Sequence, residues 1–119
     1  MGTPINEAIT FVHNVLVGAG LRNRMRLIAS GKVATGYDML TKIALGADTC
    51  NAARAMMFAL GCIQSLQCNT DKCPTGIATQ NKHRWNSLDV PDKSLRVSNF
   101  HRRVLSDFSE IVGALGLSS

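Results

Sequence analysis

Aromatic residues, acidic residues and long hydrophobic runs are all scarce in this chain of 119 residues. No apolar run approaches the roughly 20 residues that a membrane-spanning helix needs. The N-terminal stretch MGTPINEAIT lacks the basic start and the apolar segment of a secretory signal peptide. We therefore expect no membrane association and a cytoplasmic location. Thiols stay reduced there, so clustered cysteines more often bind metal or take part in chemistry than form disulfides.

The 8 acidic residues are outnumbered by 13 Lys and Arg, which gives a net charge of +5. A basic chain is compatible with nucleic-acid binding. However, the sequence has no long basic run, and its single Trp and single Tyr do not interleave with the arginines. We therefore expect no nucleic-acid partner and interpret the basic residues as a solvated or phosphate-facing surface.

Segments with helical periodicity alternate with short apolar runs along the chain. Thr3 and Pro4 should begin the first helix, and Asp92 should cap the last one. The pattern predicts helices over residues 5–17, 35–48, 53–61 and 92–115, and buried strands over residues 25–31 and 48–53. This order is typical of an α/β protein with a parallel sheet.

Two parallel strands are too few for a complete sheet. Parallel strands need cover on both faces and a strand neighbour at each edge. The hydrophobic content of 45% nevertheless supports a packed core. We therefore interpret residues 1–119 as a single segment that belongs to a larger α/β domain.

Two predicted strand-to-helix turns have the composition of a phosphate site. In ASGKVATG, residues 29–36, Ser30 and Gly31 would expose backbone N–H groups without bulky side chains. NAAR, residues 51–54, repeats the arrangement and adds Arg54 as a candidate phosphate partner. In a (β/α)8 barrel, the loops after strands 7 and 8 often form one phosphate site. Each turn is a weak signal alone, because many such turns contain glycine for steric reasons only.

Three of the four cysteines lie close together in the pattern C-x5-C-x4-C, at Cys62, Cys68 and Cys73. Zinc sites usually offer C-x2-C or C-x4-C pairs with a fourth Cys or His, and only His83 lies near downstream. An iron–sulfur cluster tolerates looser spacing, and the Cys-Pro pair at residue 73 is similar to the end of a cluster loop. Three thiolates without a fourth suit a cluster of three irons. The spacing alone leaves an iron–sulfur cluster, zinc and plain core cysteines open, and Cys50 is interpreted as a buried, inert thiol.

Two longer stretches, GKVATGYDMLTKIALGAD and RAMMFALGCIQSLQCNTDKCPTGIATQ, resemble the FMN-binding synthase domain of glutamate synthases. The resemblance is closest to the stand-alone FMN-binding family of prokaryotes. Its hallmark is ALGC, five residues, Cys, four residues, then Cys-Pro-x-Gly-x-Ala-Thr-Gln, and every element is present from Ala59 to Gln80. The resemblance runs from about Gly2 to Leu117.

This resemblance implies that the chain is the C-terminal portion of a (β/α)8 TIM barrel, comprising the last two βα units, a cluster loop over residues 62–73 and the final helix. It implies a [3Fe-4S] cluster with the ligands Cys62, Cys68 and Cys73. It also implies an FMN whose phosphate is held by the loops at Ser30, Gly31, Lys32, Ala53 and Arg54. The larger glutamate synthases are glycine-rich where this chain has Lys32 and NAAR. The resemblance therefore carries over the positions of the two loops, whose backbone N–H donors do not depend on the side chain, and not the contacts of the Lys32 and Arg54 side chains.

The activity implied is an oxidoreductase reaction that makes L-glutamate from 2-oxoglutarate and an amino donor, with electrons passing through the cluster and FMN. The partners implied are the remainder of the barrel, an electron donor that is an NAD(P)H-linked subunit or ferredoxin, and a glutaminase subunit or domain. We expect the isolated 119-residue chain to be inactive and to self-associate. The alternative is a small non-catalytic module that binds zinc through the three cysteines and His83.

Overall fold

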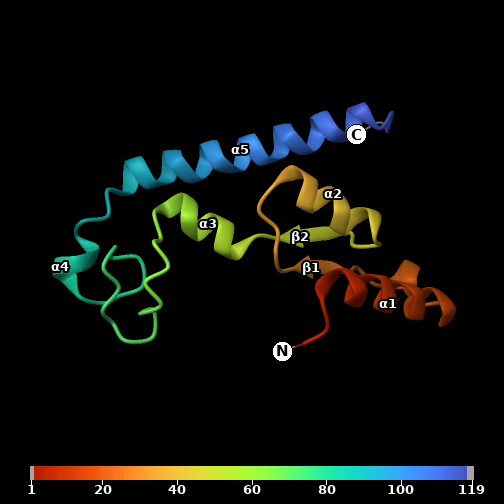
Figure 1. Ribbon diagram of the computed structural model, residues 1–119, viewed down its shortest axis with the longest axis horizontal. Coiled ribbons are helices and arrows are strands. Elements are labelled where there is room, and N and C mark those ends of the chain that lie inside the picture. Colours follow the sequence, from red (N-terminus) through yellow and green to blue (C-terminus); the bar gives the residue numbers. More distant parts are fainter. Residues whose placement is uncertain (1, 118–119) are drawn as a thin grey trace. The chain divides into compact units, whose positions relative to one another are not determined.

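The computed structural model describes residues 2–117 (Figure 1). Its elements, in chain order, are α1 (Ile5–Gly18), the 3₁₀ helix η1 (Arg22–Arg24), β1 (Ile28–Ser30), α2 (Gly36–Ala44), β2 (Thr49–Asn51), α3 (Ala53–Leu60), α4 (Lys82–Trp85) and α5 (Val90–Ala114). The described chain is therefore α/β, as predicted, and mostly helical. It comprises two compact units: one runs up to Ala53 and resumes at Val104, and the other is Arg54–Arg103. Each unit is described by itself.

The first unit contains the sheet. Strands β1 and β2 pair in parallel, with Ile28 opposite Thr49 and Ser30 opposite Asn51, and they lie side by side in Figure 1. The parallel arrangement predicted from the alternating pattern is confirmed. Each strand has only three residues, which is shorter than predicted, and no third strand of residues 2–117 pairs with either of them.

The core of the first unit is formed by Ile9 of α1, Ala29 of β1 and Ala47, which precedes β2. The prediction of a strand buried on both faces is wrong for β1, since Ala29 is buried but Ile28 is 58% exposed. Side chains on a strand alternate between faces, so one face of β1 packs against α1 and the opposite face is open. A parallel sheet with an open face lacks the cover that such sheets normally have.

Two helices in the first unit begin differently. Thr3 was expected to cap α1, but Pro4 occupies the N-cap position and no side chain caps the helix, so this prediction is wrong. Helix α2 begins with a capping box: Thr35 Oγ1 accepts the Asp38 N–H at 3.1 Å, and Asp38 Oδ2 accepts the Thr35 N–H at 3.0 Å. Gly36 follows this cap, and a Cβ atom there would collide with the backbone of Phe108 in α5.

The second unit contains α3, the cysteine-rich segment, α4 and the first part of α5. Helix α3 ends as predicted at Gly61, whose φ of 105° suits glycine. Helix α5 begins at Val90, before the predicted start, and the Asp92 N–H donates to Asp89 Oδ1 at 3.0 Å. The capping carboxylate is therefore that of Asp89, and the prediction that Asp92 caps the helix is wrong.

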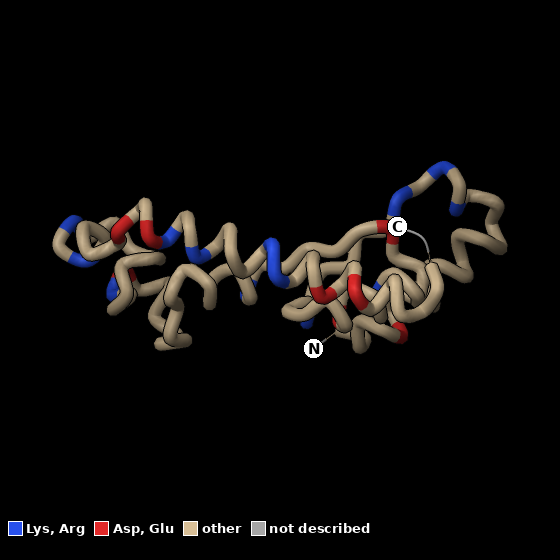
Figure 2. The backbone as a smooth tube through the Cα atoms, turned by 90° about the horizontal axis from the view of Figure 1, so that it is seen from above, with Lys and Arg blue, Asp and Glu red and all other residues tan. Residues whose placement is uncertain are grey.

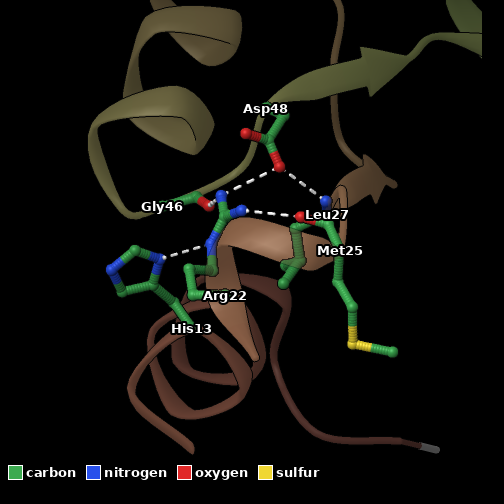
Figure 3. A network of polar contacts seen from close by, with 6 residues as sticks. All are labelled: His13, Arg22, Met25, Leu27, Gly46 and Asp48. Atoms are coloured by element: carbon green, nitrogen blue, oxygen red, sulfur yellow. Dashed lines mark hydrogen bonds and ion pairs between the residues drawn. The ribbon is translucent and has the colours of Figure 1, made fainter. Parts of the chain in front are cut away.

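A polar network joins the segments that lead into the two strands (Figure 3). The Arg22 guanidinium contacts His13 Nδ1 at 3.1 Å, Met25 O at 3.0 Å, Gly46 O at 2.9 Å and Asp48 Oδ2 at 2.8 Å. Asp48 Oδ2 also accepts the Leu27 N–H at 2.7 Å. Leu27 and Asp48 immediately precede β1 and β2, so this network fixes the N-terminal ends of both strands.

Charged residues are spread along the chain. Figure 2 shows Lys and Arg in several separate short stretches, with acidic residues among them. Within residues 2–117, no helix combines the length and the apolar character needed to cross a membrane.

Candidate phosphate turns and cysteine loop

The turn after β1 has an unusual backbone. Gly31 has a φ of 136° and Lys32 a φ of 50°, both in the region that side-chain-bearing residues rarely adopt. A Cβ atom on Gly31 would lie 3.4 Å from Ile5 Cδ1, which is close to an ordinary contact. The backbone angle, rather than crowding, is therefore what requires glycine. The left-handed conformation costs Lys32 about 1–2 kcal/mol, and such strain is typical of functional turns.

The parallel pairing places the two predicted phosphate turns at the same edge of the sheet. Ser30 is the last residue of β1 and lies opposite Asn51, the last residue of β2. Gly31 and Lys32 therefore leave the same edge as the turn that leads to Ala53. Four of the five residues predicted to hold a phosphate lie in the first unit, and Arg54 is the first residue of the second unit, where it is exposed.

The N-terminus of α2 is already occupied by its own cap. Asp38 Oδ2 accepts the N–H groups of Ala34 at 3.1 Å and Thr35 at 3.0 Å. Burial by itself would raise the pKa of Asp38, but these N–H groups, the Thr35 hydroxyl and the nearby Lys42 together hold it below its usual value. Because this carboxylate stays ionised, a phosphate at the turn would rely on the backbone of residues 30–33 rather than on the first turn of α2.

The three clustered cysteines all carry free thiols in different surroundings. Cys73 is buried, Cys62 is half-buried and Cys68 is exposed. In the described part of the chain, no group of three or more His, Cys, Asp or Glu side chains is placed to hold a metal ion. The sequence thus puts the three thiols on one segment of the second unit, but the structure does not gather them with one another or with His83. Cys50 is half-buried rather than buried, and burial raises the pKa of its thiol, as expected for an inert cysteine.

The surroundings of Cys73 favour the thiolate. A hydrogen bond with the Thr75 side chain, whose oxygen lies 3.4 Å from Cys73 Sγ, and backbone N–H groups of Ala78, Thr75 and Ile77 lower the pKa of Cys73 to about 7. The thiolate is the form of cysteine that binds metals, and thiolates suit iron–sulfur clusters and zinc. The surroundings of Cys73 therefore suit a metal ligand, but the described residues do not bring the three thiols together around one metal ion.

A second network ties the segment between Cys68 and Cys73 to the residues that follow. Asp71 Oδ1 accepts the Thr79 hydroxyl at 2.8 Å and the Gln80 N–H at 2.6 Å. The Gln80 N–H, the Thr79 hydroxyl and the nearby Arg84 hold the pKa of Asp71 below its usual value. Arg84 Nη1 also donates to Lys72 O at 3.0 Å. These hydrogen bonds therefore hold the turn through two successive residues, Asp71 and Lys72.

Comparison with known proteins covers the whole chain. A family model described as a conserved region in glutamate synthase matches residues 1–118. This chain belongs to the glutamate synthase family. It is 38% identical over 119 residues to a glutamate synthase large subunit-like protein, YerD, of Bacillus subtilis, and 39% identical over 119 residues to an archaeal glutamate synthase [NADPH] of Methanocaldococcus jannaschii. It is 33% identical over 119 residues to the glutamate synthase [NADPH] large chain of Azospirillum brasilense.

The chain spans only part of these glutamate synthases. All of it matches 23% of the Bacillus and Methanocaldococcus proteins, and 99% of it matches 8% of the Azospirillum protein. The resemblance stated from the cysteine motif is confirmed at the level of the family.

Sequence reasoning did not single out Asp71, Thr79 or Arg84. The nearest signal was the Ala-Thr-Gln end of the family hallmark, which contains Thr79 and Gln80. Asp71 also has a φ of 61°, a conformation that Asp and Asn tolerate better than most residues. A Thr-Gln pair downstream of an Asp-containing turn could therefore have indicated a side-chain cap, but only the structure shows that these residues meet.

Proposed function

We propose that this chain is the C-terminal part of the FMN-binding barrel of a glutamate synthase. The parent protein would be an oxidoreductase that makes L-glutamate reductively from 2-oxoglutarate and an amino donor. The observation that carries this proposal is the family match along the whole chain, 1–118, with the complete cysteine hallmark inside it. The parallel βαβ unit supports it, because a barrel is built from such units.

The two turns at the sheet edge are proposed to hold the FMN phosphate. Ser30, Gly31 and Lys32 would contribute backbone N–H groups from one turn, and Ala53 would contribute from the other. The pairing register supports this proposal, because it places the ends of β1 and β2, from which the two turns start, at the same edge of the sheet. Arg54 would add a guanidinium, which pairs well with phosphate oxygens. When bound, FMN supplies hydride transfer, and the protein's part is to position it.

Cys62, Cys68 and Cys73 are proposed to ligate a [3Fe-4S] cluster, which supplies one-electron transfer when bound. The support is the matching motif and the surroundings of Cys73, which favour a thiolate. The physiological electron donor would be an NAD(P)H-linked subunit or ferredoxin. Both kinds occur among the relatives, since one is named for NADPH and another, from Synechocystis, is named a ferredoxin-dependent glutamate synthase.

The zinc-binding module is not favoured, because the chain matches proteins named glutamate synthases from end to end. The test is anaerobic purification of the full parent protein. We expect a brown protein that contains iron, acid-labile sulfide and flavin, and that forms glutamate from 2-oxoglutarate and ammonium with a reduced electron donor. A colourless protein with one zinc per chain and no flavin would overturn the proposal.

A further inference from the structure

An apolar groove of about 700 Å³ lies between α3 and α5 within the second unit, and we call it the α3–α5 groove. Its apolar walls come from both helices and from the segment between them: Met56, Leu60, Ile77, Leu88, Val90 and Val97. Val90 is 72% exposed although it lines this groove. Contiguous apolar surface of this kind marks a place where another piece of protein packs.

The α3–α5 groove has the length of a short helix. Its lining residues on α5 run from Val90 to His101, which is about three turns, or roughly 16 Å at the rise of an α-helix. On α3 they are Met56 and Leu60, which are one turn apart on the same face. An apolar groove between two helices accepts the apolar face of an amphipathic helix. A helix of about three turns would cover this groove from end to end.

The polar lining of the groove is cationic or neutral, and none of the described Asp or Glu side chains contributes to it: Lys93, Ser94, Ser98 and His101. The Lys93 side chain is 23% exposed, and a Cβ atom on Gly61, just after α3, would lie 3.5 Å from its Nζ. Its ion pair with Asp92 Oδ2 is long, at 3.7 Å, and Asp92 is exposed. The groove therefore offers an ammonium group to an acidic side chain on the segment that fills it.

The relatives have the length to supply such a segment. The chain matches 23% of the Bacillus and Methanocaldococcus proteins, so most of each relative lies outside the matched part. In a (β/α)8 barrel, a helix follows each strand, and the last unit closes against the first. Under the proposed function β2 is the last strand and α3 follows it, so the next helix around the barrel is that of the first unit.

We propose that the α3–α5 groove is filled by the helix of the first βα unit of the parent barrel, an amphipathic helix that places an Asp or Glu against Lys93. This inference rests on the proposed function, which supplies the barrel. It adds the chemistry of the contact: an apolar stripe against Met56, Leu60 and Val97, and a carboxylate at the end of α3. The groove is then the seam at which the end of the barrel closes on its beginning.

Thiol labelling of the full parent protein tests whether the groove is filled. Val90→Cys places a thiol in the groove, and Asn99→Cys places one on the same helix outside it; both positions are exposed in this structure. We expect a maleimide to modify Val90→Cys about tenfold or more slower than Asn99→Cys, because the groove thiol reacts only when the covering helix moves away. The wild type, labelled in parallel, corrects for the native cysteines.

Equal labelling rates would show that the groove is open and would overturn the inference. If Val90→Cys does not fold, Ser94→Cys gives the same comparison, because Ser94 is a second exposed residue that lines the groove.

Carbodiimide coupling, which joins an amine directly to a carboxylate that it touches, tests the acidic contact. We expect mass spectrometry of the coupled parent to find Lys93 joined to an Asp or Glu of the first unit, outside residues 1–119. Lys93→Arg keeps the positive charge but has no amine to couple, so this cross-link should disappear. Coupling of Lys93 to Asp92 alone, or to another part of the parent, would overturn the assignment.

A mixture of isotopically labelled and unlabelled parent protein separates contacts within one chain from contacts between copies. We expect the Lys93 cross-link within one chain only, and a cross-link of mixed isotopes would give the groove to a second copy and overturn the inference. Neither readout depends on flavin, iron or glutamate formation. An active parent with a freely reactive Val90→Cys would therefore overturn this inference alone, whereas an inactive, flavin-free parent with the expected cross-link would overturn the proposed function and leave the filled groove standing.

Discussion

At the residue scale, backbone conformation marks the two regions to which we assign chemistry. Gly31 and Lys32 have positive φ values after β1, and Asp71 has one inside the cysteine loop. Residues other than glycine rarely hold such angles unless their surroundings impose them. At Asp71 the surroundings are visible as hydrogen bonds to Thr79 and Gln80. The strained backbone conformation of Lys32 supports the proposal that this turn binds a ligand.

Replacing Gly31 by valine should weaken FMN binding by the parent protein by an order of magnitude or more. A β-branched side chain strongly disfavours the φ of 136° found here, and its bulk would obstruct the approach of a phosphate to the backbone. Flavin titration of the apo protein measures the effect, with Gly18→Val as a control, since a Cβ atom at Gly18 meets nothing within 4 Å. Unchanged flavin affinity in a folded Gly31→Val protein would show that this turn does not hold the phosphate.

Replacement of Cys62, Cys68 or Cys73 by serine should abolish the visible absorbance of the cluster in the parent protein, because each would remove one thiolate ligand. Cys50→Ser should leave it intact, since that half-buried thiol has a pKa raised by burial and lies on β2, outside the cysteine loop. Absorbance and iron content after anaerobic purification are the measurements. Bleaching by Cys50→Ser with a brown Cys62→Ser protein would show that the ligand assignment is wrong.

At the element scale, the close approach of α2 and α5 depends on one glycine. Gly36 is the first residue of α2 and is buried, and its missing Cβ is what lets the backbone at Asp107 and Phe108 come near. The capping box of Thr35 and Asp38 fixes where α2 begins, and hence where Gly36 lies. The start of α2 and its contact with α5 are therefore set by three residues that lie close together in sequence, Thr35, Gly36 and Asp38.

Gly36→Ala should destabilise the parent protein by about 1–3 kcal/mol, the usual cost of overpacking against a backbone that cannot yield. Gly113→Ala is the matched control, because a Cβ atom there meets nothing within 4 Å in α5. Alanine is a better helix former than glycine, so this control should be neutral or stabilising by about 0.5–1 kcal/mol. Urea midpoints test the pair, and equal midpoints would contradict the close contact at Gly36.

The Arg22–Asp48 network should make the N-terminal edge of the sheet sensitive to acid. The hydrogen bond from Arg22, followed by that from the Leu27 N–H, lowers the pKa of Asp48 below its usual value. When folding lowers the pKa of a carboxyl group, its ionised form stabilises the folded protein. This stabilisation is fully present above the pKa of the group in the unfolded chain, and it is lost as the pH falls through the pKa of the group in the folded protein. The network should therefore weaken as the pH falls below the usual pKa range of an aspartate.

Amide exchange at Leu27, followed from neutral to acid pH and corrected for the intrinsic rate, measures this loss. Protection should fall with pH in the wild type and should already be low at neutral pH in Asp48→Ala, which has no oxygen to accept the Leu27 N–H or to pair with Arg22. Protection that is equal in the two proteins at every pH would contradict the role assigned to the network.

At the scale of the whole molecule, much apolar surface is exposed within each unit. In the first, Phe11 is 69% exposed and Ile28 58% exposed. In the second, Leu66 is 85% exposed, and an apolar groove of about 700 Å³ is lined by side chains of α3 and α5 that include Met56 and Val97. No large side chain of the described chain is fully buried. Such surfaces usually contact other chains or other parts of the same protein.

The isolated 119-residue chain should therefore self-associate and bind FMN weakly or not at all. Its two strands leave unpaired edges, and it contains at most the phosphate turns of the proposed flavin site. Sedimentation velocity and a flavin titration on this chain are the measurements, with the full parent protein as the control. A well-behaved monomer with tight FMN binding would mean that the barrel-fragment proposal is wrong.

The sequence alone determined the family, the alternation of helices and strands, and the two candidate regions. These features depend on local signals: hydrophobic periodicity, glycines at turns, and the fixed spacing of Cys62, Cys68 and Cys73. The parallel sheet was also predictable, since a helix between two short strands is the usual crossover. The assignments of Cys62, Cys68 and Cys73 as ligands, and of the two turns to FMN, stay predictions.

Only the tertiary structure decided which carboxylate caps α5, which face of β1 is covered, and which groups Arg22 and Asp71 bind. Each depends on residues that are distant in sequence or on the competition between neighbouring candidates, such as Asp89 and Asp92 at the start of α5. Gly46 and Asp48 meet Arg22 because the chain folds back through α2, and Thr79 meets Asp71 across the cysteine loop. No local pattern encodes such contacts, because their energy depends on where the backbone places both partners.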